Sequence, residues 1–152
     1  IAAIAAMTAC VLLAACSWRT QGPADLGQRI AVRVVADQGR LPRAGLELQT
    51  AAAEAVHYRT GWTVRGDGEA RLDISVDKDE FAATATDERD IASRWRYRVH
   101  ITALLVSRHG TRTWSGSGTG YAGSRVEEQA AVRNAAEDVA DDLARWLAGL
   151  KL

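Results

Sequence analysis

The segment Arg94-Trp-Arg-Tyr-Arg-Val-His-Ile101 decides the fold, because polar and apolar residues alternate through it without a break. A period of two is typical of a β-strand with one buried face and one solvated face. The segment continues to Arg108, which makes it the longest strand candidate of the chain. The residues predicted to face inward are Trp95, Tyr97, Val99 and Ile101. The residues predicted to face outward are Arg94, Arg96, Arg98 and His100.

Further strands are predicted on both sides of this segment. Residues 71–81 alternate in the same way, and residues 82–93 form a predicted polar connection to the central strand. His109-Gly110 predicts a tight turn, after which the chain returns as another strand. The predicted strands span residues 29–35, 71–81, 94–108 and 111–117, and residues 62–65 are predicted to form a short strand or the entry to one.

Two helices complete the pattern. Residues 43–59 are rich in good helix formers, and Gly61 is well placed to end that helix. A second helix is predicted to open at Ser124, with Glu127 completing a capping box, and to run almost to the last residue. Its predicted buried stripe is Val126, Ala130, Ala136, Val139, Leu143, Trp146, Leu147 and Leu150. The predicted stripe of the first helix is Leu48, Ala51, Ala52, Ala55 and Val56.

These elements predict an α+β fold of order β-α-β-β-β-α. The economical arrangement is a two-layer sandwich, with two helices packed on one face of a mainly antiparallel sheet of about four strands. Four tryptophans fall at inward or helix-stripe positions and are expected in the core. They are Trp62, Trp95, Trp114 and Trp146.

An uncharged apolar run precedes the folded part. It is shorter than the roughly 20 residues that a membrane-spanning helix needs, and it resembles a secretory signal. Leu13-Ala-Ala-Cys16 resembles the lipobox of bacterial lipoproteins, in which the cysteine is acylated; the alternative is an ordinary signal peptide. We therefore expect a signal peptide at 1–15, a lipidated tether at 16–28 and a folded domain at 29–152. Because the chain begins with Ile1, we expect further residues upstream.

Composition excludes several classes of protein. The 19 basic and 19 acidic residues cancel, which argues against nucleic-acid binding. Cys10 and Cys16 both lie in the export segment, so no disulfide or cysteine metal site is expected in the folded body. The three histidines, His57, His100 and His109, lack metal-ligand spacing. No nucleophile elbow is present, and we predict that the protein is not an enzyme and binds no metal.

Two motifs allow more than one interpretation. Gly118-Thr-Gly-Tyr-Ala-Gly123 formally matches a dinucleotide fingerprint, but no second parallel strand is predicted after it, so a glycine-rich strand end or loop is preferred. The outward row Arg94, Arg96, Arg98 and His100 could form cross-strand ion pairs with Asp73, Asp77 and Asp79, which is the preferred interpretation. The alternative is an anionic ligand or partner, such as phosphates on a lipid headgroup.

Several segments, taken in order, resemble the LptE-type LPS-assembly lipoproteins. They are Cys16-Ser-Trp-Arg-Thr20, Ile30-Ala-Val-Arg-Val-Val35, Pro42-Arg-Ala-Gly-Leu-Glu47, Thr60-Gly-Trp-Thr-Val64, Trp114-Ser-Gly-Ser117 and the closing helix at 128–147. Ser17 stands where that family usually has glycine. The likeness covers nearly the whole chain.

The resemblance implies a binding protein with an LptE-like domain at 29–152. It would be a lipoprotein on the periplasmic face of the outer membrane, anchored through Cys16, without a cofactor beyond its covalent lipid. Its implied partners are LPS and the β-barrel LPS translocon protein LptD, with Arg94, Arg96, Arg98 and His100 as the candidate LPS face. The alternative function is a periplasmic lipoprotein that scaffolds or activates an envelope enzyme of cell-wall synthesis.

Overall fold

The computed structural model describes residues 28–41, 43–86 and 92–150, so Cys16 and the predicted tether up to residue 27 lie outside the described residues. The strands are β1 (Arg29–Asp37), β2 (Thr63–Val64), β3 (Ala70–Thr86), β4 (Ala92–Ser107) and β5 (Gly110–Ala122). The helices are α2 (Ala44–Thr60), the short 3₁₀ helix η1 (Arg125–Glu127) and α3 (Glu128–Gly149). The predicted elements are therefore all present, with shifted bounds.

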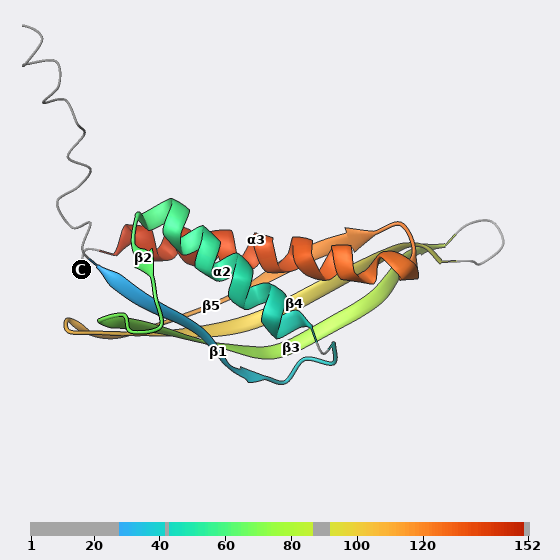
Figure 1. Ribbon diagram of the computed structural model, residues 1–152. Coiled ribbons are helices and arrows are strands. Elements are labelled where there is room, and N and C mark those ends of the chain that lie inside the picture. Colours follow the sequence, from blue (N-terminus) through green and yellow to red (C-terminus); the bar gives the residue numbers. More distant parts are fainter. Residues whose placement is uncertain (1–27, 42, 87–91, 151–152) are drawn as a thin grey trace, which may run out of the picture.

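One sheet carries both helices on a single face, which confirms the α+β two-layer arrangement (Figure 1). The strand order is β2-β1-β3-β4-β5. The strands β3, β4 and β5 are antiparallel neighbours, whereas β1 runs parallel to β2 and β3. The described sheet has five strands rather than about four, because the two residues of β2 pair with the start of β1.

Helix α2 follows its prediction closely. Leu48, Ala52 and Val56 are buried against the sheet. The helix ends at Gly61, whose φ of 72° is left-handed and whose N–H donates to the carbonyl of His57. Glycine adopts this conformation without the steric cost of a Cβ. The predicted end of the helix at Gly61 is therefore confirmed.

Helix α3 begins later than predicted. Residues 125–127 form η1 first, which leaves the Val126 side chain 94% exposed, and Ala130 is exposed as well. The predicted stripe is correct from Ala136 onward, where Val139, Leu143 and Leu147 are fully buried. The predicted capping box does not form: the Glu127 carboxylate accepts the N–H of Gly123, one residue before Ser124, at 2.9 Å, and the Ser124 side chain makes no capping hydrogen bond.

The glycine motif holds α3 against β5. Gly118 and Gly120 are buried on the helix side, and a Cβ on either would overlap the carbonyl oxygen of Ala135 or Ala131 of the helix. Such close approach of two backbones is a usual reason for glycine inside a strand. The motif is thus the end of an ordered strand, as preferred from the sequence, and its first two glycines serve packing.

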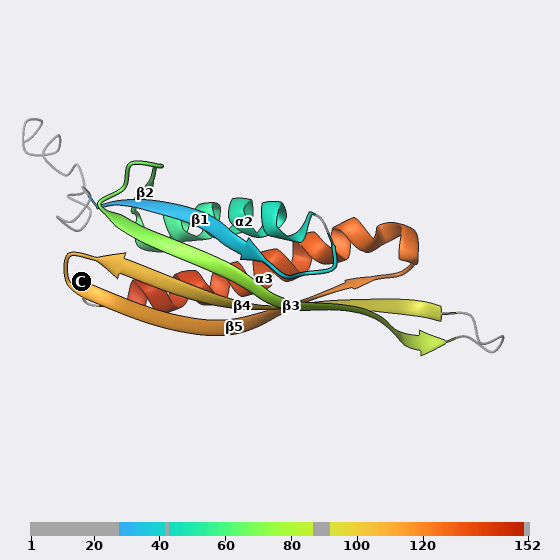
Figure 2. The same ribbon diagram turned by 90° about the horizontal axis from the view of Figure 1, so that it is seen from below.

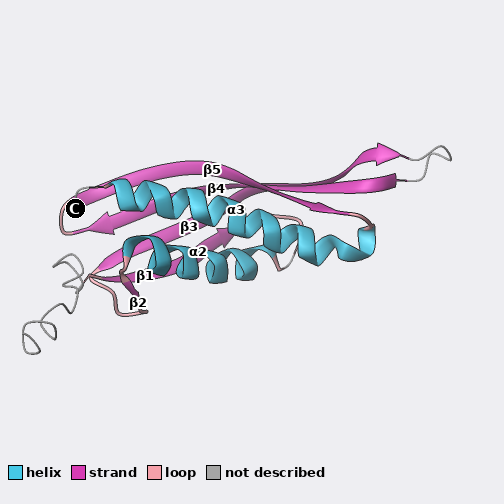
Figure 3. Ribbon diagram, turned by 90° about the horizontal axis from the view of Figure 1, so that it is seen from above, coloured by secondary structure: helices cyan, strands magenta, loops and turns pink. Residues whose placement is uncertain are grey.

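The hairpin of β3 and β4 is longer than predicted and extends beyond the helices (Figures 2 and 3). The expected connection at 82–93 is wrong, since β3 continues to Thr86 and β4 starts at Ala92. The extra residues of β3 are Ala82-Ala-Thr-Ala-Thr86, which pair with β4 through the backbone. Small side chains give little hydrophobic alternation, so the pattern missed them.

Candidate functional site

The outward row on β4 forms as predicted. Tyr97, Val99 and Ile101 are buried beneath the helices, so the residues between them point away from the helix layer. Arg94 and His100 are exposed, and Arg96 and Arg98 are half-buried. The face of the sheet that the helices leave open is the one seen from below in Figure 2. We call the part of this open face on β3, β4 and β5 around the row the basic face.

The preferred interpretation of the row, cross-strand ion pairs with three aspartates, is wrong. Asp73 lies opposite Leu104, and its carboxylate instead binds Arg33 at 2.9 Å and Arg71 at 2.7 Å. Asp77 accepts the Thr102 hydroxyl at 2.7 Å. Among the described residues, no carboxylate lies within 4.0 Å of a charged nitrogen of the row.

The third aspartate, Asp79, is buried on the helix side. The register of β3 against β4 shifts between Val76 and Lys78, and this bulge turns Asp79 inward, where it is only 5% exposed. Its carboxylate accepts the N–H groups of Arg40 at 2.6 Å and Leu41 at 3.2 Å, and the Tyr97 hydroxyl at 3.1 Å. The sequence placed Asp79 on the outward face, whereas in the structure it ties the loop between β1 and α2 to the sheet.

Asp37 completes this carboxylate clamp. Its side chain accepts the N–H groups of Gly39 at 2.9 Å and Gly45 at 3.2 Å, so two carboxylates hold one loop and the start of α2. Burial, and then the neighbouring Asp79 carboxylate, raise the pKa of the Tyr97 hydroxyl far above its ordinary value. Tyr97 is therefore a neutral hydrogen-bond donor at every physiological pH, which fits a structural role.

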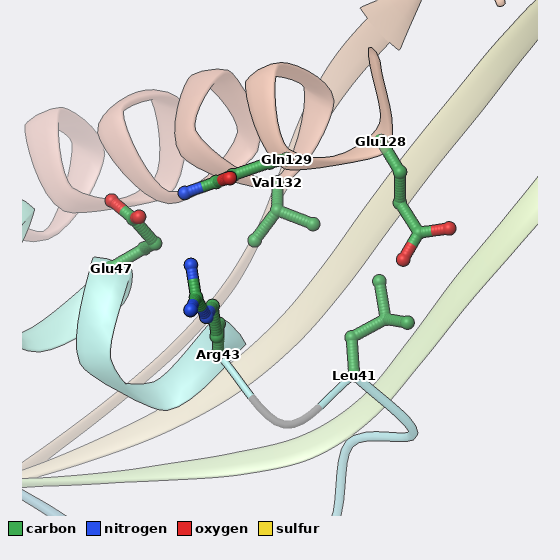
Figure 4. Close-up of a pocket in the computed structure, with 6 residues that line it drawn as sticks. All are labelled: Leu41, Arg43, Glu47, Glu128, Gln129 and Val132. Carbon is green, nitrogen blue, oxygen red and sulfur yellow. The ribbon is translucent and has the colours of Figure 1, made fainter. Parts of the chain in front are cut away.

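A cavity of about 310 Å³ lies beside this loop, between the first turns of α2 and α3 (Figure 4). Its lining residues are Leu41, Arg43, Glu47, Glu128, Gln129 and Val132. Glu47 also faces Arg133 of α3 at 3.6 Å. The lining mixes both charges with two aliphatic side chains, and it includes no residue of the row on β4.

Cross-strand neighbours give the basic face its chemistry. The register places Lys78 and Ser117 on either side of His100. In the same way, Glu80 and Thr119 flank Arg98, and Ala82 and Tyr121 flank Arg96. The central column is thus cationic, and the column on β5 carries hydroxyl groups.

Aromatic rings lie on both sides of the outer end of β4. On the basic face, the Arg94 guanidinium lies 4.6 Å from the ring centroid of Tyr121, which is 49% exposed. On the helix side, Phe81 stacks on Trp95 at 5.1 Å, and the Arg125 guanidinium lies 5.9 Å from the Trp95 centroid. Contacts of this kind hold a guanidinium in place while its N–H groups stay available.

The described residues offer no constellation for catalysis or metal binding. They contain no group of three or more His, Cys, Asp or Glu side chains that could hold a metal ion. His57 Nδ1 lies 3.0 Å from the carbonyl oxygen of Trp62, and His109 contacts Arg108. Within the same residues, no helix has the length and hydropathy required to cross a bilayer.

The described part of the chain is a two-layer α+β domain in which helices cover one face of the sheet and the row of β4 lies on the other. The chain belongs to the LptE family, described as lipopolysaccharide-assembly, whose sequence model matches residues 27–147. This family is non-enzymatic, has no known cofactor and works with the LPS translocon machinery. The predicted resemblance is therefore confirmed at the level of the family.

Solved structures support the fold. A lipoprotein from Caulobacter crescentus is 22% identical, with a TM-score of 0.52, and the match covers 80% of this chain and 93% of that one. The rare lipoprotein B from Shewanella oneidensis is 8% identical, with a TM-score of 0.53 and coverages of 79% and 93%. The PelC dodecamer from Paraburkholderia phytofirmans is 21% identical, with a TM-score of 0.52 and coverages of 76% and 88%. A search of the curated proteins finds no match.

Proposed function

We propose that this protein is an outer-membrane lipoprotein subunit of the LPS transport and assembly machinery, which binds an LptD-type β-barrel and LPS. The family assignment over residues 27–147 is the observation that carries the proposal. The basic face adds a physical reason: Arg94, Arg96 and Arg98 form no ion pair with a described carboxylate. Guanidinium groups in such positions suit the phosphates of LPS, because they bind phosphate through two parallel hydrogen bonds.

The barrel partner is tested by affinity purification from a detergent-solubilised envelope. The full-length lipoprotein, tagged at its C-terminus, is expected to co-purify with a large β-barrel protein that mass spectrometry identifies as LptD-type. A tagged unrelated lipoprotein of the same membrane serves as the control. Recovery of a soluble or single-span cell-wall enzyme, with no barrel, would overturn the proposal in favour of the alternative function, an envelope-enzyme scaffold.

The LPS site is tested by reversing the charge of the row. Arg94→Glu, Arg96→Glu and Arg98→Glu together are expected to abolish LPS binding, measured by retention on immobilised LPS at a fixed, stated salt concentration. A matched triple variant, Arg65→Glu, Arg108→Glu and Arg112→Glu, changes the net charge equally at exposed positions of the opposite end of the sheet. If both triple variants bind equally, net charge or another surface is responsible, and the row is not the site.

We also propose that Cys16 carries the acyl chains that anchor the protein. Stable residence would require more than one chain, because a single chain gives only marginal binding. Intact mass measurement of the protein from envelope membranes is expected to show a multiply acylated cysteine. Cys16→Ala is expected to remove the added mass and to release the protein from the membrane fraction. An unmodified cysteine in membrane-bound protein would contradict the lipobox prediction.

A further inference from the structure

We propose that two copies of this protein pair through the free edge of β5, which joins their sheets into one continuous sheet. Residues 110–118 of one copy run antiparallel to the same residues of the other, with Trp114 at the two-fold axis. The inference goes beyond the proposed function, because it uses backbone groups at the edge of the sheet and not the side chains of the basic face.

The two edges of the sheet differ in how much backbone they leave free. At one edge, β2 covers the start of β1, the register of β1 shifts after Val34, and the Gln49 side chain accepts the Val34 N–H at 3.3 Å. At the other edge, β5 pairs with β4 without a register shift, and no described element lies beyond it (Figure 3). Native sheets usually protect an edge with bulges, charges or a cover, because unpaired N–H and C=O groups bind further strands. The β5 edge has little of this protection.

The odd-numbered residues of β5 carry the unpaired groups. Ser107 and Gly110 close a tight turn, so Gly110 and the even-numbered residues after it bond to β4. The odd-numbered residues therefore direct their N–H and C=O groups away from the sheet. Thr119 shows this directly, since its N–H donates to the Asp138 carboxylate of α3 at 3.0 Å. Asp138 closes the edge there, so the stretch that is open to another strand is 110–118, with Trp114 at its centre.

A strand centred on Trp114 is complementary to itself. Antiparallel pairing about this centre places Thr113 opposite Ser115 of the second copy, and Thr111 opposite Ser117 of the second copy. Outward backbone groups then meet outward backbone groups, as an antiparallel ladder requires. The one charged residue of 110–118, Arg112, faces a glycine of the second copy, so no like charges are opposed.

The centre of the stretch also carries aromatic surface that a second copy would cover. Trp114 is half-buried, and its ring centroid lies 6.4 Å from that of Trp146 of α3. Its indole lies across Gly116, where a Cβ would overlap it. The two-fold axis brings the Trp114 rings of both copies together and places Arg112 of each copy beside the indole of the other. This symmetry about Trp114 favours a second copy over an unrelated strand.

The oligomeric state of the full-length lipoprotein in detergent tests the proposal. Light scattering is expected to show a dimer whose population rises with protein concentration. Thr113→Pro removes an outward N–H, which an edge strand tolerates, and is expected to weaken dimerisation about tenfold or more. Thr113→Val keeps the N–H and should dimerise as the wild type does. All three proteins carry the same N-terminal segment, so shared micelles cannot produce the difference, and circular dichroism checks folding. A monomeric wild type, or equal dimerisation of the proline variant, would overturn the proposal.

Disulfide trapping tests the register. Opposed residues of a hydrogen-bonded pair have Cα atoms about 5.5 Å apart, which a disulfide can bridge. Thr113→Cys with Ser115→Cys is therefore expected to give a covalent dimer on mild oxidation. Thr111→Cys with Thr113→Cys is the matched control, whose cysteines are not opposed in this register. Hydrogen exchange of the Ser115 and Ser117 amides should be slower in the dimer than in the proline variant. Equal trapping of both cysteine pairs, or slowed exchange only when another protein is bound, would overturn pairing with a second copy.

Discussion

The two faces of β5 differ in what they contact. Towards α3, the strand presents Gly118 and Gly120, and the helix backbone lies directly against them. On the open face, the alternate residues Ser117, Thr119 and Tyr121 present polar groups beside the arginines of β4. One face of the strand therefore packs closely against the helix, and the other presents polar groups to solvent. Substitutions on the first face should change stability, and substitutions on the second face should leave it nearly unchanged.

The largest loss of stability is expected for Gly118→Ala. Its new Cβ would overlap the carbonyl oxygen of Ala135, so α3 would have to move away from the sheet along its length. Overpacking against backbone costs about 3 kcal/mol. Denaturant unfolding should show this loss, and Gly120→Ala should behave alike because it meets the carbonyl of Ala131.

Ser117→Ala is the matched control for the glycine substitution. It removes an exposed hydroxyl one residue away and should change the free energy of unfolding by no more than about 0.5 kcal/mol. If both alanine variants unfold alike, α3 does not rest on the strand as closely as the structure places it. The contrast between the two faces of β5 would then be lost.

Asp79→Ala should come close behind the glycine variant. It leaves the N–H groups of Arg40 and Leu41 and the Tyr97 hydroxyl without their acceptor in a buried site. Orphaned buried donors cost about 1–3 kcal/mol each, reduced here where the loop can reach water, so a total of about 2 kcal/mol is expected. Hydrogen exchange should also show faster exchange of the Arg40 and Leu41 amides.

The neighbouring aspartate provides the comparison for Asp79. Asp77→Ala removes one exposed hydrogen bond to Thr102 and should cost less than about 1 kcal/mol. Its loop amides should exchange as in the wild type. Equal losses for the two aspartates would mean that the bulge does not turn Asp79 inward.

The sequence predicted the layers of this fold because its strongest signals are periodic. The alternation in β4 and the apolar stripes of the two helices predict which residues are buried. Most of these predicted residues are buried in the structure. The sequence did not predict the bulge at Asp77, because the residues around it are polar and show no apolar alternation with or without a bulge. A signal existed: the inward apolar residues are even-numbered up to Val76, and the next, Phe81, is odd-numbered, a change of parity that a bulge produces.

The candidate site was predicted in position and not in its contacts. The alternation of β4 placed Arg96 and Arg98 on one face, because a strand allows no other arrangement. Their partners depend on register, which the composition of β3 does not determine. The hydroxyl column on β5 was missed for the same reason, since Thr119 becomes a neighbour of Arg98 only once the strands are paired.

The smallest effect is expected between the helices, where Asp141 of α3 binds Arg59 of α2 at 2.6 Å and Arg145 at 2.9 Å. Hydrogen bonds from Arg59, and then Arg145, hold the pKa of the Asp141 carboxyl below its ordinary value. A lowered pKa in the folded state means that the ion pair stabilises the fold above the unfolded pKa, near 4, and that this contribution is lost as the pH falls through the folded pKa.

Asp141→Asn should remove that pH dependence. Exposed pairs contribute little, so the Tm at pH 7 should fall by no more than about 2 °C, and the difference from the wild type should vanish at low pH. Thermal melts of both proteins between neutral and acidic pH provide the measurement, with Asp142→Asn, whose pairing with Arg145 does not join the helices, as the control. If the difference in Tm between the wild type and Asp141→Asn persists at the lowest pH, Asp141 contributes through packing and not through its charge. The contact between the two helices would then depend on close packing, as the contact of α3 with the glycines of β5 does.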